Sequence, residues 1–179
     1  MGSPEGHKPV EEIAVVEIRW SRIKDIAQIP SFAHKGDAGF DLAAAEDAVI
    51  YPFQKRLVGT GLKVEIPEGY ELQVRPRSGL SLKTPLFIAN SPGTIDSNYR
   101  GEIGIIVYHG PTLEYRGIRS FLLSFLKAIR TPLVIKAGDR IAQGVISKVP
   151  ELVFSDVAED KLAPTTRGTG GFGSTGIKG

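Results

Sequence analysis

Short runs of alternating apolar and polar residues, separated by turn-forming residues, dominate this chain. Leu62–Ile66 and Tyr70–Arg75 each alternate strictly, and Pro67-Glu68-Gly69 lies between them. A strand with this period buries one face and leaves the other in water, so we expect these two runs to form a β-hairpin. Similar runs predict further strands at Ala14–Trp20, Val49–Phe53, Leu86–Asn90, Glu102–Tyr108, Leu133–Lys136, Arg140–Ser147 and Leu152–Phe154. Many short strands closed by turns are typical of an all-β barrel or sandwich.

One segment has a helical period instead. Apolar residues recur at positions i, i+3, i+4 and i+7 between Ile118 and Ile129, with charged and small polar residues between them. This pattern predicts an amphipathic helix, inserted at about residues 109–132. The helix should end before Thr131, because a residue that precedes a proline avoids the helical conformation. Leu123 lies off the apolar stripe, and we expect it to be exposed.

The tail from residue 165 to residue 179 is rich in glycine and has one aromatic residue, Phe172. A segment of this composition does not fold alone, so we expect a flexible arm that a ligand or another subunit orders. Its glycines match the dinucleotide-binding pattern, but the strand and helix that this motif needs are missing. Unhindered backbone N–H groups, together with Arg167, Ser174 and Thr175, are suited to a polyphosphate. A tail without function is the alternative.

Composition and charge narrow the function classes. The chain has 179 residues, no cysteine, three scattered histidines and a net charge of +2. These numbers favour one domain over residues 1–179 and argue against disulfides, thiolate chemistry and a cysteine or histidine metal site. They also argue against binding to nucleic acid through phosphate neutralisation. No run approaches the ~18 apolar residues of a membrane span, and the N-terminus shows no apolar signal core. We therefore expect a soluble, cytoplasmic protein.

Two further segments carry candidate chemistry. Arg75–Ser81 follows a strand and opens a short helical turn, so Arg77 and Ser78 are either phosphate contacts or an ordinary helix cap beside a solvated arginine. The loop from Ser91 to Gly101 carries Asp96 and Tyr99. Loops on a rigid β scaffold often hold catalytic groups, and a carboxylate there can orient and deprotonate a water molecule. The alternative is that Asp96 caps a turn, which is also the default interpretation of the nearby acids Asp37 and Asp41.

Taken in order, five segments resemble the five motifs of the trimeric dUTP diphosphatases (dUTPases). Together they are far more specific than any one motif. The segments are Ala38–Leu42, Pro76–Leu80, Gly93–Gly101, Gly138–Gln143 and Arg167–Gly176.

This resemblance implies an all-β, jelly-roll-like subunit of a homotrimer, with each active site built from three chains. The arm of residues 165–179 would close over a neighbouring subunit's site. The implied reaction is the hydrolysis of dUTP to dUMP and pyrophosphate with Mg²⁺, which keeps uracil out of DNA and supplies dUMP for thymidylate synthesis.

The resemblance also implies roles for individual residues. Asp96 would activate the attacking water, Tyr99 would pack under the deoxyribose, and Asp41 would position Mg²⁺ through water. The uracil edge would be read by Asn90 and by backbone groups around Thr94, Ile95 and Gly104. The phosphates would be held by Arg77, Ser78, Gly79 and Gln143. From the arm, Arg167 would grip the terminal phosphate, Phe172 would stack on uracil, and phosphate donors would come from Gly173, Ser174 and Thr175.

Two other functions remain to be weighed. A dCTP deaminase resembles this chain around the Asp96 loop, but its catalytic glutamate would fall on Ile106, which cannot move a proton. The second alternative is a nucleotide-binding regulatory protein that acts through the insertion. There Leu123, with Arg119, Lys127 and Arg130, would form a docking face for a protein partner, whereas a helix packed on its own subunit or trimer is the simpler interpretation.

Overall fold

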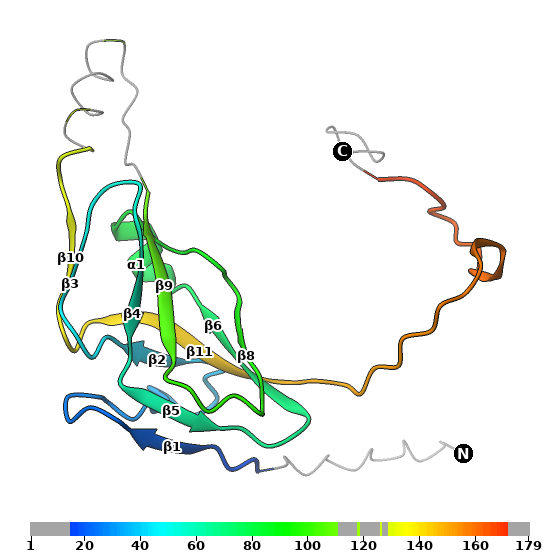
Figure 1. Cartoon of the computed structure of the whole chain (residues 1–179), viewed down its shortest axis with the longest axis horizontal. Coiled ribbons are helices and arrows are strands. Elements are labelled where there is room, and N and C mark those ends of the chain that lie inside the picture. Colours follow the sequence, from blue (N-terminus) through cyan, green and yellow to red (C-terminus); the bar gives the residue numbers. More distant parts are fainter. Residues whose placement is uncertain (1–14, 111–117, 119–125, 127–128, 172–179) are drawn as a thin grey trace, which may run out of the picture. The chain divides into compact units, whose positions relative to one another are not determined.

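The computed structural model describes residues 15–110, 118, 126 and 129–171. The chain divides into two compact units, residues 1–149 and 150–179. The described part of the first unit consists mainly of strands with one short helix, α1 (Ser78–Lys83), which confirms the predicted all-β class (Figure 1). The strands are β1 (Arg19–Arg22), β2 (Phe40–Ala43), β3 (Ala48–Ile50), β4 (Lys55–Gly59), β5 (Leu62–Glu65), β6 (Tyr70–Arg75), β7 (Leu86–Ile88), β8 (Gly93–Ile95), β9 (Gly104–His109), β10 (Leu133–Ile135) and β11 (Arg140–Lys148).

Antiparallel pairing arranges these strands in sheets that share one core. One sheet has the order β2-β11-β6-β8, another has the order β4-β9-β7, and β1-β5 and β10-β3 form two-stranded ladders. Alternate side chains point inward from each strand, as the period of two requires. The most deeply buried of them come from seven strands and include Leu42, Ile50, Val58, Leu62, Leu72, Ile105 and Ile141.

The predicted hairpin between Leu62–Ile66 and Tyr70–Arg75 is wrong. Strand β5 pairs with β1, whereas β6 pairs with β11 and β8. Both strands bury the apolar face that their alternation predicts, but they do so from different sheets. The turn ends at Gly69, whose positive φ of 83° lets the chain change direction and cross from one sheet to the other.

Three strands are too short or too irregular for alternation to mark them. In β2, Phe40, Leu42 and Ala43 are buried and Asp41 is partly exposed, so only three residues alternate. Strand β4 exposes its first three residues, and β8 has only three residues. Strand β1 starts at Arg19, five residues after the start predicted from Ala14.

The insertion follows β9 of the β4-β9-β7 sheet, and the chain then enters β10, which pairs with β3 in a separate ladder. Ile118 and Leu126 of the predicted helix are helical and exposed, and Ile129 is also exposed. The rest of the helix, including Leu123, Arg119 and Lys127, lies outside the described residues. Within the described ranges, no helix is long and apolar enough to cross a membrane.

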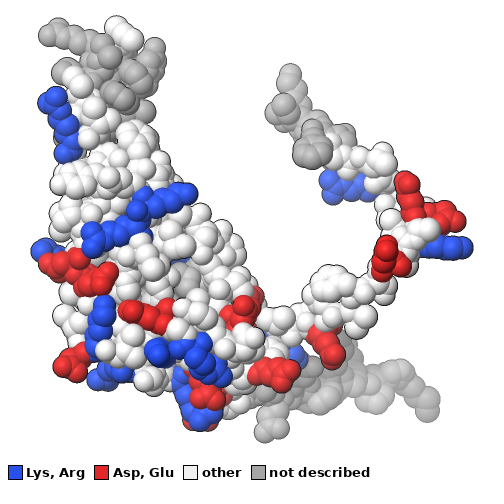
Figure 2. All heavy atoms as spheres, viewed as in Figure 1, with Lys and Arg blue, Asp and Glu red and all other residues white. Residues whose placement is uncertain are grey.

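The second unit carries the predicted strand Leu152–Phe154. This prediction is wrong, because the segment forms no strand and its side chains are 64% to 90% exposed. A short 3-10 helix, Glu159–Lys161, follows it. On the face of the first unit shown in Figure 2, acidic and basic side chains are interspersed, in keeping with the net charge of +2.

Candidate active site

Adjacent strands bring three motif segments together at one end of the larger sheet. Gln143 on β11 lies opposite Asp41 on one side and opposite Arg75 of β6 on the other. Just after β6, the chain turns through Pro76 and Arg77 into α1. Residues about 35 to 100 positions apart in the sequence therefore meet at this edge of the molecule.

Two arginines share the carboxylate of Asp41, and we refer to them as the Asp41–Arg77–Arg140 cluster. Arg77 donates through Nε to Oδ1 at 2.5 Å and through Nη2 to Oδ2 at 3.2 Å. Arg140 donates to Oδ2 at 3.2 Å, and its carbonyl oxygen accepts a hydrogen bond from Arg77 Nη1 at 2.9 Å. The side chains of Asp41 and Arg77 are 34% and 27% exposed. With two guanidinium groups and one carboxylate, the cluster has a net positive charge that an anion can reach.

An open groove of about 500 Å³ lies beside this cluster. Gln143 forms part of its wall, where its amide Nε2 donates to the carbonyl oxygen of Pro76 at 2.6 Å. The groove is lined by Gln73, Arg75, Pro76, Ser78, Ser81, Ser91, Pro92 and Gln143. Ser78 and Gln143 thus line the same groove, and Gly79 follows Ser78 in α1 with open space beside its Cα.

The structure also distinguishes the two interpretations of Arg77. It occupies the N-cap position of α1, but its side chain makes no capping hydrogen bond. The guanidinium group points instead to Asp41, so the expectation of a solvated arginine at an ordinary helix cap is wrong.

The loop after β8 holds Asp96 and Tyr99 in a closed turn. The amide of Tyr99 donates to the carbonyl oxygen of Asp96 at 3.1 Å, and Arg100 donates to the carbonyl oxygens of Ser97 and Tyr99. The turn is therefore closed by one main-chain hydrogen bond and by the guanidinium group of Arg100. Among the described residues, the carboxylate of Asp96 has no hydrogen-bond partner, and it is exposed. By contrast, the carboxylate of Asp37 accepts from the amide of His34 at 2.8 Å, as expected for a turn acid.

The residues predicted to read uracil lie near the junction of β7 and β8. Asn90 follows β7, and its amide nitrogen would be 3.0 Å from a Cβ placed on Gly93. Thr94 and Ile95 belong to β8 and pair with β6. Gly104 begins β9, where a side chain would collide with Leu57 at 2.6 Å. Because these glycines carry no side chains, Asn90 and Leu57 approach the backbone closely.

The candidate residues fall into separate groups. Within the described part of the chain, no hydrogen bond or ion pair joins Asp96 to the Asp41–Arg77–Arg140 cluster. Arg167 belongs to the second unit, where its Nε donates to the carbonyl oxygen of Gly170 at 2.7 Å. The remaining arm residues lie outside the described residues: Phe172, Gly173, Ser174 and Thr175.

The structure places several residues in the cluster, in the groove or beside Tyr99 to which the sequence analysis gave no role. Arg140 joins the cluster, and Arg75 and Gln73 line the groove, where Arg75 donates to Gln73 Oε1 at 3.0 Å through Nε. Arg140 lies inside the Gly138–Gln143 motif, so the sequence pointed to this segment but did not reveal that Arg140 would contact Asp41. Glu102 contacts the Tyr99 hydroxyl through its backbone, and no local pattern marks it.

Comparisons with known proteins agree with this geometry. The dUTPase family model matches residues 25–111. A deoxyuridine 5'-triphosphate nucleotidohydrolase of Picosynechococcus is 45% identical over 162 residues, covering 90% of this chain and 99% of the relative. The corresponding enzyme of Wolinella succinogenes is 43% identical over 167 residues, covering 93% and 99%.

Solved structures show the same likeness. The dUTPase of Staphylococcus bacteriophage 80alpha with dUPNHPP is 30% identical, with a TM-score of 0.74 and coverage of 90% of this chain and 99% of that one. The dUTPase of phage phi11 of S. aureus, described with its species-specific insert, is 30% identical, with a TM-score of 0.63 and coverage of 80% and 98%. A mutant of the phi11 enzyme with a structural Mg(II) ion is 29% identical, with a TM-score of 0.65 and coverage of 82% and 99%. The chain belongs to the dUTPase family.

Proposed function

We propose that this chain hydrolyses dUTP to dUMP and pyrophosphate with Asp96 as the group that activates the attacking water. The observation that carries the activity is the identity of 45% to a curated dUTP hydrolase over 90% of the chain. The assignment of Asp96 is supported by its exposed carboxylate, which no described residue engages, on a loop closed by a main-chain hydrogen bond and by the Arg100 side chain. A carboxylate in this state is available to accept a proton from water.

The phosphates bind at the Asp41–Arg77–Arg140 cluster and the adjoining groove. Arg77 supplies a bidentate cation, and Ser78, Gly79 and Gln143 supply hydroxyl, backbone and amide donors. Arg77 is engaged by Asp41 in the free protein, so a phosphate must compete with that carboxylate. Hydrolysis of a phosphoanhydride depends mainly on such positioning and charge.

The residues present fit a Mg²⁺ ion carried by the substrate. Among the described residues, no group of three acidic or histidine side chains forms a metal cage. Mg²⁺ on a nucleotide does not need one, because it keeps several waters and is bound by one or two carboxylates together with the phosphates. Asp41 is the carboxylate that would hold it, through water. When bound, the ion neutralises charge on the phosphates.

The nucleoside binds near β7, β8 and the Asp96 loop. Asn90, with backbone groups of Thr94, Ile95 and Gly104, reads the uracil edge. The ring of Tyr99 packs beside the deoxyribose and leaves no room for a 2′-hydroxyl. The position of Asn90 supports this assignment, because its side-chain amide lies directly against Gly93, the residue before Thr94 and Ile95.

The active form is a homotrimer in which the arm of one subunit closes over a site of the others. Arg167 grips the terminal phosphate, Phe172 stacks on uracil, and Gly173, Ser174 and Thr175 donate to phosphates. Closure of such an arm excludes bulk water from the reaction. We place the protein in the cytoplasm, with dUTP as its small-molecule substrate.

A deaminase reaction is disfavoured. Ile106 lies in β9 opposite Leu57 of β4, and its carbonyl oxygen accepts from the amide of Ala89 at 2.8 Å. The position that would carry the deaminase glutamate is therefore an apolar side chain in a regular strand.

A second function through the insertion is favoured by one observation. The solved phage dUTPases that this chain resembles include one described with a species-specific insert and one described in the control of transfer of virulence genes. By analogy, the exposed Ile118 and Leu126 belong to a segment that binds a regulatory protein partner.

The test is release of pyrophosphate from dUTP, dCTP, dTTP and UTP with Mg²⁺, run beside an ammonia assay. We expect release from dUTP alone and no ammonia from dCTP. Ammonia from dCTP would establish the deaminase instead. No release from any nucleotide would indicate a binding protein that kept the site without the activity.

A further inference from the structure

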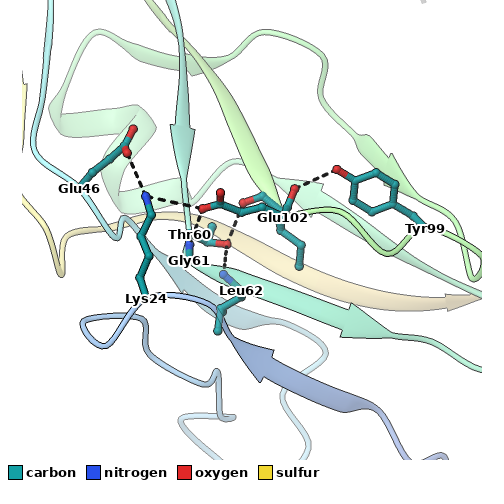
Figure 3. A network of polar contacts seen from close by, with 8 residues as sticks. Lys24, Glu46, Thr60, Gly61, Leu62, Tyr99 and Glu102 are labelled. Carbon is teal, nitrogen blue, oxygen red and sulfur yellow. Dashed lines mark hydrogen bonds and ion pairs between the residues drawn. The ribbon is translucent and has the colours of Figure 1, made fainter.

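Glu102 joins the Asp96 loop to the turn between β4 and β5 (Figure 3). Its backbone carbonyl oxygen accepts a hydrogen bond from the Tyr99 hydroxyl at 3.0 Å. Its carboxylate Oε1 accepts from the amide of Gly61 at 2.8 Å. One residue therefore contacts the proposed sugar-binding ring on one side and a core turn on the other.

The Tyr99 ring is held at its hydroxyl end. The ring lies directly over Gly101, where any added Cβ would collide with the hydroxyl oxygen and Cζ of Tyr99. Tyr99 as a whole residue is 42% exposed, so a ligand can reach part of it. The position of the hydroxyl is set by the carbonyl of Glu102, because that is its hydrogen-bond acceptor.

The carboxylate of Glu102 is held by charge, by a backbone donor and by shape. Lys24 Nζ lies 3.9 Å from Oε1 of Glu102 and 3.1 Å from Oε2 of Glu46. The hydrogen bond from Lys24 holds the pKa of Glu46 below its ordinary value, so the ammonium serves two carboxylates. Gly59 makes room for this arrangement, because a Cβ there would collide with Oε1 of Glu102.

The backbone beyond Glu102 is anchored in the core. The hydroxyl of Thr60, which is fully buried, donates to the carbonyl oxygen of Ile103 at 2.7 Å. The amide of Ile103 donates to the carbonyl oxygen of Leu62 at 2.8 Å. Glu102 is the residue just before this anchor. The contacts of its carboxylate therefore fix its orientation, and with it the position of the carbonyl oxygen that accepts from Tyr99.

We propose that Glu102 is a positioning residue for sugar discrimination, which fixes the Tyr99 ring by tying the Asp96 loop to Gly61 and Lys24. The inference rests on the proposed role of Tyr99. A ring held in one place excludes a 2′-hydroxyl, whereas a ring free to move by a small distance admits it.

The test compares Glu102→Ala, Glu102→Gln and Gly59→Ala with the wild type. Glu102→Ala removes the acceptor of the Gly61 amide, and Gly59→Ala displaces the carboxylate from another strand while Glu102 stays intact. Glu102→Gln keeps an acceptor oxygen and should retain the wild-type behaviour. Glu65→Ala is the matched control, because it removes a surface ion pair with Arg19 on the neighbouring strand and leaves the loop untouched.

The primary readout is the ratio of kcat/KM for dUTP to kcat/KM for UTP. We expect this ratio to fall about tenfold in Glu102→Ala and Gly59→Ala, the scale of one lost hydrogen bond to a charged group. A general loss of structure would lower both kcat/KM values together and leave the ratio unchanged. Hydrogen exchange of the amides from Asp96 to Ile103 should rise in the same two variants and in neither Glu102→Gln nor Glu65→Ala.

The possible failures are distinguishable. If the wild type does not discriminate dUTP from UTP, the proposed role of Tyr99 is wrong, and the inference falls with it. If the wild type discriminates and both Glu102→Ala and Gly59→Ala keep its ratio, Glu102 has no positioning role. Should Glu102→Ala fail to fold, the ratio in Gly59→Ala decides alone.

Discussion

The phosphate side and the Asp96 loop of this site are held by different kinds of contact. At the Asp41–Arg77–Arg140 cluster, three partly exposed charged groups face one another, and the two arginines can exchange the Asp41 carboxylate for a phosphate. The loop is closed by a main-chain hydrogen bond and by the Arg100 side chain, and it adjoins the buried Thr60, where a lost partner costs about 1–3 kcal/mol. The part that must exchange partners with a ligand is thus held by charges that the ligand can reach, while the part that must recognise shape is built in before binding.

The largest expected effect is a loss of kcat on substitution of Asp96 in the loop after β8. Asp96→Asn should keep binding of dUPNHPP and lower kcat about a thousandfold, because an amide holds a water but does not accept its proton. Pyrophosphate release and calorimetric titration measure the two quantities. Asp37→Asn is the control, since that carboxylate serves a turn at His34. Retained turnover in Asp96→Asn would mean that the base lies elsewhere.

Removal of residues 167–179 tests whether the fixed loop and the cluster suffice without the arm. We expect a loss of about a hundredfold or more in kcat/KM, as for removal of preorganised charge stabilisation. Folding should persist, because residues 150–179 form a separate unit. A shorter truncation, of residues 177–179, leaves the arm motif intact and should retain activity. Circular dichroism and gel filtration check the fold, and full activity without residues 167–179 would refute a role for the arm.

The role of the Asp41–Arg77–Arg140 cluster can be tested through the dependence of activity on Mg²⁺ concentration. Asp41→Asn frees Arg77 and Arg140 from their shared carboxylate and removes the proposed magnesium partner, so the Mg²⁺ concentration for half-maximal activity should rise about tenfold. A Mg²⁺ titration of kcat measures this. Asp139→Asn is the control, because Asp139 accepts from the amide of Lys136 and an asparagine still does so. An unchanged titration in Asp41→Asn would remove Asp41 from the magnesium site.

Deletion of Ile118–Ile129, with a short linker in its place, should leave dUTP hydrolysis largely intact. The insertion joins β9 to β10, whereas the cluster lies at β2, β6 and β11, which belong to another sheet. Light scattering with gel filtration reports the oligomer at the same time. Dissociation of the oligomer on deletion would make the helix structural and remove the motive for a protein partner.

The smallest expected effect is on Tm, from the ion pair of Asp47 with Lys136. Lys136 lies in the turn before β11, the strand that carries Arg140 and Gln143. The Lys136 ammonium and the Ala137 amide lower the pKa of Asp47 below its ordinary 3.8, and Asp47 raises the pKa of Lys136 above 10.5. The pair therefore stabilises the fold at neutral pH, and its contribution is lost as the pH falls through the lowered pKa of Asp47. The Tm difference between wild type and Asp47→Asn should be small at neutral pH and vanish in acid. A difference that persists in acid would show that charge is not its source.

Local pattern by itself determined much of this protein. The alternation of Tyr70–Arg75 predicted a strand with the bounds of β6, and the turn after Arg75 was expected to open a short helix, as α1 does. Inward and outward faces followed from the same period, because side chains of a strand alternate whatever its partner. The ordered motifs pointed to the family, since each motif is a short contiguous stretch.

Which strands pair with one another was decided by the tertiary structure. Alternation did not reveal that β5 pairs with β1 and not with β6, because any half-buried strand offers the same two faces. It failed for β2, where only three residues alternate, and the apolar run Leu152–Phe154 wrongly suggested a strand, because this run is exposed and forms none. The joining of Arg77 to Asp41 and of Glu102 to Gly61 needed the fold, because each contact links residues about 40 positions apart and packing of the whole core brings them together.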